Sequence, residues 1–365
     1  MEYVIIFFIV IILALFNRQL THRSRTFFLV FVYGYIVLLM GFRYRVGIDT
    51  LNYMESYDWV QVLDDLFDND FTQTRLEPGY MLLCALSKAV TEDFWFFQIV
   101  HSLILNFCVF VFIYRYTKNS FTGIGVYFIL IFFYFSTEIL RESLAIAIFL
   151  LNYENLRKRR WMHYYLFSFL SVSFHYSAVI LWLLPFVGRL KFNIWYVTSC
   201  IVLLMIMPWA EWFSQTIPIV SVAERVSRYV LGADKLNLNW RIAYIIKALL
   251  CPIVIMLMYK CLRKESVWTP YILLHILLGI GAFAIPIIFS RFTNYTQLFV
   301  VVYIANLLYE LRYKYLLKYT IVAILFCSQL NYFHNMFWAW YPYESIFTKQ
   351  KVYEREKLWE QYFGG

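Results

Sequence analysis

Long apolar runs, separated by short polar segments, extend along the whole chain of 365 residues. An α-helix rises about 1.5 Å per residue, so about 20 residues cross the roughly 30 Å hydrocarbon core of a bilayer. The pattern predicts an all-α polytopic membrane protein with about 10–12 transmembrane or re-entrant helices. The main apolar runs cover residues 3–16, 26–42, 94–114, 120–137, 139–156, 193–213, 241–261, 268–289, 296–311 and 318–338.

Two further apolar segments do not fit a plain single crossing. Residues 79–91 are too short to span the bilayer, whereas residues 161–187 are too long for one crossing and contain His175 near their middle. If the first segment crosses only in part and the second forms a hairpin, every basic cluster falls on one side of the membrane. Irregular backbone inside a membrane is tolerated where it lines a cavity or is buried in protein. We therefore expect both segments to border a cavity.

The composition agrees with a membrane solvent. Hydrophobic residues make up 62% of the chain and charged residues 15%, against about 25% charged residues in an average soluble domain. A soluble chain of this length has too little interior to bury so many apolar side chains. We find no linker and no internal repeat, so we expect a single integral membrane domain over residues 1–365.

The net charge of +9 does not indicate a nucleic-acid partner, because the basic residues are not gathered on one surface. They form short clusters between apolar runs, which is the positive-inside pattern of membrane topology. The clusters are Arg18 with Arg23 and Arg25, Arg115 with Lys118, residues 157–160, Arg189 with Lys191, Arg263 with Lys264, and Arg312 with Lys314 and Lys318.

This topology places two loops, about 43–78 and 214–240, on the non-cytoplasmic side. The first loop contains eight acidic and three basic residues, and its stretch from Tyr57 to Phe71 has helical amphipathic spacing. The C-terminal tail, about 341–365, is rich in aromatic residues and contains both acidic and basic residues. This composition indicates an interfacial segment. The six cysteines occur singly, without metal-ligand spacing, so we expect no metal site.

Ionisable residues near apolar helix ends mark candidate sites, because charge is costly in a membrane and usually serves a function there. The first group contains Arg43, Arg45, Asp49 and Tyr53. The planar fork of arginine suits a phosphate or carboxylate ligand. The alternative is a local Arg43–Asp49 ion pair that only holds the loop.

Two more groups involve glutamates at helix starts. Glu77 precedes Pro78, and this order marks a helix N-terminus that favours an anion, so a structural cap is the simpler explanation. Arg141 lies between Glu138 and Glu142, which would repel each other at a spacing of four residues. Arg141 is therefore either a structural ion between these carboxylates or a ligand-binding group.

The last two groups are His175, at the tip of the expected hairpin, and Arg291 with Tyr295 at a helix end after Pro286. A histidine can shuttle protons or donate to a phosphate near neutral pH, although a lone one is more often structural. The expected topology puts the candidate arginines on the non-cytoplasmic face, together with Arg225 or Arg228. Their convergence on one cavity would create an anion site, and a lipid pyrophosphate is the expected anion.

The segments GFRYRVGIDTLNY, LEPGY, LRESLAIAIFLL, FHYSAVI and SRFTNY, in this order, resemble the EpsG family. These are membrane proteins of bacterial exopolysaccharide and capsule assembly, related in role to Wzy polymerases. The resemblance extends from Gly41 to Tyr295, and its most specific part is the element Arg43-x3-Gly47-x-Asp49-x3-Tyr53. Family members often carry Arg-Gln where this chain has Arg141-Glu142, which changes the local charge.

The resemblance implies a repeat-unit polymerase with a GT-C-like membrane glycosyltransferase architecture, in the bacterial cytoplasmic (inner) membrane as a multi-pass protein. A growing glycan on undecaprenyl pyrophosphate would pass to a hydroxyl of the next lipid-linked repeat unit, in capsule, exopolysaccharide or O-antigen synthesis. The expected partners are undecaprenyl-pyrophosphate-linked oligosaccharides and membrane lipids, with a chain-length regulator as a further candidate.

The candidate residues suit this chemistry without a metal or cofactor, because arginines can neutralise the charge of the leaving pyrophosphate. Arg43, Arg45, Arg141 and Arg291 are the candidates for that role. The acceptor hydroxyl needs a base, and the candidates are Asp49, Glu77 and His175. Tyr53 and Tyr295 are placed to stack on sugar rings.

Three alternatives remain open from the sequence. A glycan ligase would use the same arginines. A lipid-linked oligosaccharide flippase would typically show an internal repeat, and none is visible. An acyltransferase acting on sugars would need a deeply placed His or a His/Asp pair, and no Asp lies near His175 in the sequence.

Overall fold

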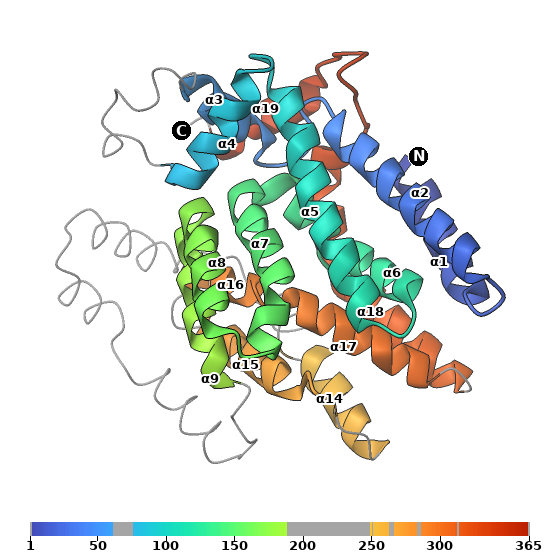
Figure 1. Ribbon diagram of the computed structural model, residues 1–365. Coiled ribbons are helices and arrows are strands. Elements are labelled where there is room, and N and C mark those ends of the chain that lie inside the picture. Colours follow the sequence, from blue (N-terminus) through green and yellow to red (C-terminus); the bar gives the residue numbers. More distant parts are fainter. Residues whose placement is uncertain are drawn as a thin grey trace. The chain divides into compact units, whose positions relative to one another are not determined.

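The computed structural model describes residues 2–60, 76–187, 249, 251–262, 266–282, 286–311 and 314–363 (Figure 1). The elements in these ranges are helices, and the β-structure there is a single bridge between Arg43 and Ser345. The predicted all-α class is therefore confirmed for the described part of the chain. The loop at 214–240, with Arg225 and Arg228, and most of the expected helix after Tyr57 lie outside the described residues.

Two helices in the described ranges are long and apolar enough to cross a membrane: α2 (His22–Gly41) and α5 (Phe94–Tyr116). A third candidate is the broken pair Leu316–Leu330 and Tyr332–Trp340, which together make up most of α18 (Tyr315–Trp340). Shorter apolar helices accompany them. The structure thus supports a membrane protein, and the expected total of 10–12 membrane helices stays a prediction.

The chain forms two compact units, of which unit 1 comprises Met1–Val179 and Tyr332–Gly365. It contains α2, α5 and the C-terminal part of α18 from Tyr332 onward. Its other complete helices are α1 (Glu2–Phe16), α3 (Thr50–Trp59), α4 (Pro78–Lys88), α6 (Ser120–Leu130), the π-helix η1 (Tyr134–Glu138), α7 (Leu140–Arg157), α8 (Trp161–Phe174) and α19 (Tyr353–Phe363).

Unit 2 comprises Ile180–Asn331. Its described helices are the second half of the 3₁₀ helix η2 (Tyr176–Leu183), α9 (Leu184–Val187), α14 (Cys251–Cys261), α15 (Thr269–Gly281), α16 (Pro286–Asn294), α17 (Gln297–Glu310) and the first part of α18. The rings of Tyr259 and Tyr303 stack with centroids 4.3 Å apart, which joins α14 to α17. Buried His275 of α15 contacts the Thr296 hydroxyl at 2.7 Å, directly before α17.

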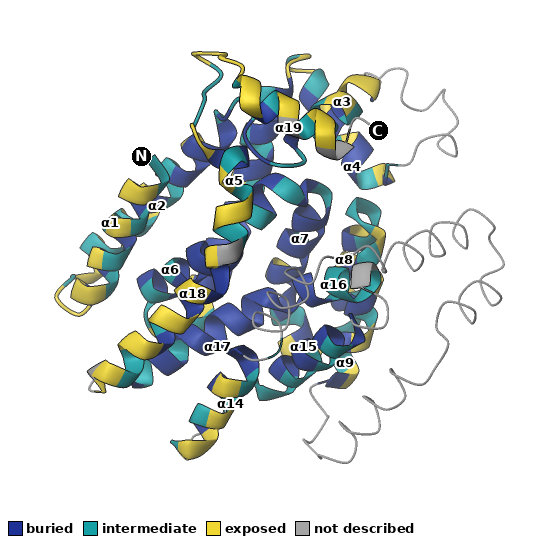
Figure 2. Cartoon of the chain, turned by 180° about the vertical axis from the view of Figure 1, so that it is seen from behind, coloured by how far each residue is buried: buried dark blue, intermediate teal, exposed yellow. Residues whose placement is uncertain are grey.

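Helix α7 lies in the core of unit 1 and is buried along most of its length (Figure 2). It runs parallel to α5, because His101 of α5 contacts Ser143 near the start of α7 and Tyr116 contacts Glu154 near its end. It runs antiparallel to α8, because Asn152 donates to the Tyr164 carbonyl. Helices α5, α7 and α8 therefore lie side by side along a common axis. Their ends lie at two opposite edges of the unit.

These two edges carry different sets of ionisable residues. Arg115, Arg157 and Arg160 end or begin helices at one edge, whereas Arg141 and His175 lie at the other. The predicted topology requires this separation, because it assigns basic clusters to the cytoplasmic side and the candidate site to the opposite side. The arrangement within unit 1 agrees with that prediction.

Both segments that did not fit a plain crossing are irregular in the structure. Helix α4 has 11 residues, so its length is about 16 Å, well short of the hydrocarbon core. Helix α8 ends at Phe174, His175 is extended (φ −160°, ψ 128°), and the 3₁₀ helix η2 begins at Tyr176. The short segment and the break at the predicted hairpin tip are therefore present.

The C-terminal tail, predicted to be interfacial, binds back to the loop that follows α2. The backbone N–H of Ile346 donates to the Phe42 carbonyl at 2.9 Å, and the N–H of Tyr44 donates to the Glu344 carbonyl at 2.8 Å. The Arg355 guanidinium is buried and donates to the carbonyls of Arg45, Trp338 and Pro342. The tail therefore packs as part of unit 1.

A glycine allows α4 to approach α8 closely. A Cβ atom at Gly79 would lie 2.5 Å from the Ser173 hydroxyl oxygen and 2.9 Å from its carbonyl oxygen, closer than real Cβ contacts. Because one of these atoms is backbone, a side chain at this position would push the helices apart. Gly79 thus sets the distance between Glu77, two residues earlier, and His175, two residues after Ser173.

We expect Arg355→Ala to destabilise the protein, because each buried carbonyl left without a donor costs about 1–3 kcal/mol. The midpoint of thermal unfolding in detergent should fall, and proteolysis of the tail should become faster. Lys357→Ala, at an exposed position of the same helix, is the control and should change neither. Equal midpoints for the two variants would show that the tail contacts contribute nothing to stability.

We expect Gly79→Ala to lower the unfolding midpoint, because overpacking typically costs about 1–3 kcal/mol. The control is Gly34→Ala in α2, where an added Cβ meets no atom within 4 Å. This control should leave the midpoint unchanged or raise it, since alanine favours a helix. Thermal unfolding of both variants in the same detergent decides the point, and an unaffected Gly79→Ala variant would contradict the close approach.

Candidate functional site

The candidate site lies where three helix ends of unit 1 meet: the start of α4, the start of α7 and the end of α8. Glu77 directly precedes α4, Arg141 is the second residue of α7, and His175 directly follows α8. The contact between Gly79 and Ser173 holds α4 and α8 together at this point. Three residues that are far apart in the sequence therefore become neighbours.

Glu77 and Arg141 form an ion pair at the centre of the site. A carboxylate oxygen of Glu77 lies 2.7 Å from Nη1 of Arg141. The Glu77 side chain is only 5% exposed, whereas that of Arg141 is 27% exposed, so the arginine forms the open side of the pair. The buried Nε of Arg141 has no hydrogen-bond partner among the described residues. The pair thus presents an arginine whose donors are only partly used.

The structure corrects the simpler explanation for Glu77. Glu77 occupies the N-cap position of α4 and Pro78 follows at the first helical position, as the sequence indicates. Its carboxylate makes no capping hydrogen bond, however, and binds Arg141 instead. Arg141 in turn pairs with a carboxylate 64 residues earlier in the sequence.

His175 is the third member of the site. Its Nε2 lies 4.0 Å from the second carboxylate oxygen of Glu77, and its side chain is 16% exposed. Its Nδ1 lies 2.6 Å from the hydroxyl of Ser177 and accepts from the Ser177 backbone N–H at 3.3 Å. Both ring nitrogens therefore have defined surroundings, and the imidazole faces the ion pair with its Nε2 edge.

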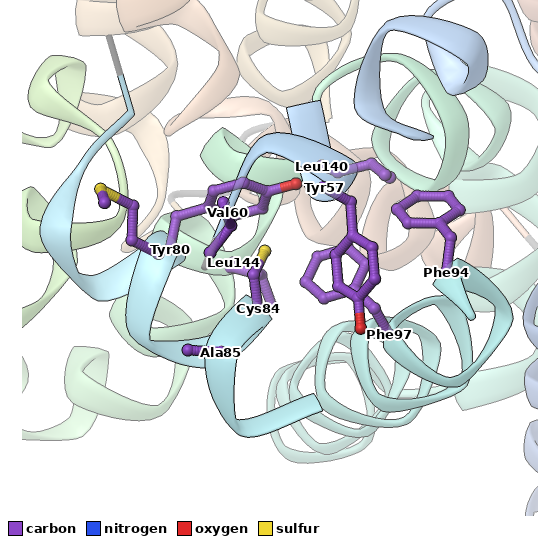
Figure 3. Close-up of a cluster of buried hydrophobic side chains, with 10 residues drawn as sticks. Tyr57, Val60, Tyr80, Cys84, Ala85, Phe94, Phe97, Leu140 and Leu144 are labelled. Atoms are coloured by element: carbon purple, nitrogen blue, oxygen red, sulfur yellow. The ribbon is translucent and has the colours of Figure 1, made fainter. Parts of the chain in front are cut away.

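The aromatic cluster of Tyr57, Tyr80, Phe94 and Phe97 is part of a larger group of buried hydrophobic side chains (Figure 3). The guanidinium carbon of Arg141 is 6.0 Å from the centre of the Tyr80 ring, which is within the range of a cation–π contact. Tyr80 is fully buried and contacts the ring of Phe97 at 5.5 Å. This cluster removes the arginine from water on one side, so its charge acts in a medium of low polarity.

A second group of polar and aromatic residues is linked to this cluster through Tyr53. The Tyr53 ring lies 6.4 Å from that of Tyr80, and its hydroxyl donates to the Glu138 carbonyl at 3.3 Å. The Glu138 carboxylate accepts from the Tyr332 hydroxyl. The Tyr53 backbone N–H donates to the carbonyl of Asp49, which directly precedes α3, at 3.0 Å.

Arg43 and Arg45 are engaged by the polypeptide itself. Arg43 is fully buried and donates to the carbonyls of Met40 and Val46, in place of the ion pair with Asp49 that local charge suggests. Burial lowers the pKa of Arg43 to about 10, which leaves it charged at neutral pH. Arg45 forms a two-pronged ion pair with Glu356 of the tail. Their role in substrate binding stays a prediction.

Backbone conformation and close packing explain why the same motif has a glycine at position 47. Gly47 adopts a φ of +119°, which L side chains rarely adopt, and a Cβ atom there would lie 2.6 Å from Thr137 and from the Thr50 hydroxyl. Its N–H donates to the Ala339 carbonyl at 2.9 Å. The motif therefore joins the loop before α3 to η1 and to the end of α18.

The remaining predicted residues, Arg291 and Tyr295, belong to unit 2. Arg291 is half-buried near the end of α16, and Tyr295 is almost completely buried just after it. Stacking of Tyr295 on a sugar would require an exposed ring face, so that role stays a prediction. The structure does not place these two residues relative to the Glu77–Arg141 pair.

The site is suited to binding an anion. It combines a partly open arginine, a histidine and a low-polarity surrounding, and these favour charged hydrogen bonds to a phosphate group. Within the described ranges, no group of three or more His, Cys, Asp or Glu side chains is arranged to hold a metal ion. Arg141 and His175 are groups that can neutralise negative charge on such a ligand.

Sequence reasoning did not assign a role to Tyr80, Ser177 or Tyr332. Tyr80 and Ser177 lie in the motifs LEPGY and FHYSAVI, so their place beside Glu77 and His175 was a usable signal. Tyr332 lies inside an apolar run that carries no motif. Its contact with Glu138 joins positions 194 residues apart and has no sequence signal.

Comparison with known proteins gives one match. The model of the EpsG family matches residues 26–345, which is well over half of the chain and includes Glu77, Arg141 and His175. No curated protein and no solved structure matches the chain. Membership in the family indicates a polysaccharide polymerase-like function and a place in the membrane. The chain belongs to the EpsG family.

Proposed function

We propose that this protein is a polysaccharide repeat-unit polymerase of the bacterial cytoplasmic (inner) membrane, which it crosses several times. It transfers a growing glycan from undecaprenyl pyrophosphate to a hydroxyl of a new lipid-linked repeat unit at the outer face. The products would be capsule, exopolysaccharide or O-antigen chains. The observation that carries this proposal is the partly open Arg141, held by buried Glu77 and faced by His175.

Arg141 is proposed to bind the pyrophosphate of the donor. Its guanidinium has five N–H donors, and Glu77 contacts one nitrogen at 2.7 Å. The 27% exposed side chain leaves a face on which phosphate oxygens can accept from the other donors. Neutralising that charge makes pyrophosphate a better leaving group, so metal-independent transfer is the mechanism we propose.

The transfer step has a defined balance of atoms. The acceptor hydroxyl oxygen attacks the anomeric carbon of the donor sugar and forms the new glycosidic bond. The bond between that carbon and the phosphate oxygen breaks, and its electron pair leaves with undecaprenyl pyrophosphate. The hydroxyl proton passes to a carboxylate base, for which Asp49 is our candidate because Glu77 is occupied by Arg141.

The remaining candidates take supporting roles in this proposal. Tyr53 lies between Asp49 and the aromatic cluster, where its ring suits a sugar face. Arg43 and Arg45 hold the loop that carries Asp49. A role of Arg291 in substrate binding stays a prediction. Undecaprenyl-pyrophosphate-linked oligosaccharides and membrane lipids are the proposed partners, and a chain-length regulator is a further one.

We expect Arg141→Ala to reduce polymer formation by about 100-fold or more, the usual effect of removing a donor that stabilises developing charge. The assay uses purified protein in lipid with an undecaprenyl-pyrophosphate-linked repeat unit, chelator present, and a gel that resolves glycan length. Arg157→Ala is the matched control, because Arg157 lies in the same helix, is 57% exposed and pairs only at the surface.

The products of that assay also separate the alternatives. A ladder of glycans supports a polymerase, a single transfer product would indicate a ligase, and no product with authentic substrate would favour a flippase. A ladder that persists unchanged in Arg141→Ala would remove this residue from the mechanism.

We expect Asp49→Asn to lower the rate of polymerisation, because a general base contributes about 10²–10⁴-fold. The unfolding midpoint of the variant is measured alongside, so that a loss of catalysis is separated from a loss of folded protein. Glu55→Gln, at an exposed position of the same helix, is the control for loss of charge. Full activity of Asp49→Asn would assign the base to another group.

A further inference from the structure

The surroundings of His175 define which of its ring nitrogens carries the proton. Nδ1 lies 3.3 Å from the backbone N of Ser177 and 2.6 Å from its hydroxyl oxygen. A backbone N–H can only donate, so Nδ1 must act as the acceptor in this contact. In the neutral imidazole one nitrogen accepts and the other carries the hydrogen. The proton of neutral His175 is therefore on Nε2.

In this tautomer the Nε2–H donor of His175 faces the Glu77–Arg141 ion pair. Nε2 faces a carboxylate oxygen of Glu77 at 4.0 Å, and the other oxygen of that carboxylate binds Arg141 at 2.7 Å. Three groups thus converge in the order histidine, glutamate, arginine. Nε2–H and the guanidinium are both donors, and Glu77 lies between them.

We propose that His175 acts as a hydrogen-bond donor to the pyrophosphate of the lipid-linked sugar, through Nε2–H, and not as the base for the acceptor hydroxyl. This rests on the proposed function of the site. A base must accept a proton on a nitrogen with an available lone pair, and the lone pair of Nδ1 is directed at Ser177. Nε2 has no lone pair in this tautomer.

The role fits the charge that develops in the reaction. When the bond to the anomeric carbon breaks, negative charge accumulates on the phosphate oxygens. A neutral imidazole N–H stabilises that charge without giving up its proton, as donors in oxyanion sites do. His175 and Arg141 would then act together on the leaving group, and the proton of the acceptor hydroxyl would leave by another residue.

Amide substitutions test the role. His175→Gln places an amide group near the position of Nε2, whereas His175→Asn places it near Nδ1. A donor role predicts that Gln keeps activity within about tenfold of the wild type, and that Asn and Ala lose about 100-fold. A base role predicts that Gln is as inactive as Ala, because an amide accepts no proton, and this result would overturn the proposal. Equal unfolding midpoints for Gln and Asn make the comparison valid.

A spectroscopic measurement tests the tautomer without any substrate. The ¹⁵N shifts of imidazole-labelled protein distinguish Nδ1–H from Nε2–H, and comparison with His175→Gln assigns the signal among the six histidines. An Nε2–H signal is expected, and an Nδ1–H signal would overturn the inference. If wild-type protein forms no glycan ladder, the proposed function fails, but the tautomer is still measured, so the two failures are distinguishable.

Discussion

The buried ion pair between Glu77 and Arg141 is the interaction on which the arrangement of unit 1 depends at this edge. Taking two charges out of water is costly, and the cost is recovered only when the geometry is good and each charge keeps its partner. The pair therefore requires the starts of α4 and α7 to meet within hydrogen-bond distance. Removing Arg141 would leave the Glu77 carboxylate buried and without this partner, which is destabilising. The pair thus restrains both helix starts and positions the partly open arginine.

The position of α4 also depends on the absence of a side chain at Gly79. Ser173 fills the space that a Cβ would need, and this contact brings the end of α8, with His175, next to Glu77. Arg45 and the tail hold the loop before α3. The motif arginines and glycines therefore determine backbone geometry, and this geometry places the candidate chemical groups.

Much of this could be predicted from the sequence, because it depends on local pattern. The long apolar runs 26–42 and 94–114 predicted α2 and α5. The short apolar run 79–91 predicted α4, and the position of His175 predicted the break after α8. The pairing of charges could not be predicted in this way. Glu77 and Arg141 are 64 residues apart, and the Arg45 contact with Glu356 spans 311. Charge alone allows several partners for each residue, and the choice among them is made by tertiary packing.

A physical reason explains why a negatively charged glutamate lies next to a proposed phosphate site. A guanidinium has donors on three nitrogens, and Glu77 occupies Nη1 of Arg141. The carboxylate fixes the direction of the guanidinium before substrate binds, which reduces the reorganisation needed on binding. Because Glu77 is 5% exposed and Arg141 is 27% exposed, the repelling charge lies behind the attracting one. A pyrophosphate that approaches from the open side meets the arginine first. In the proposed mechanism the proton of the acceptor would pass to a residue outside the pair, because a protonated Glu77 would no longer be an ionic partner for Arg141.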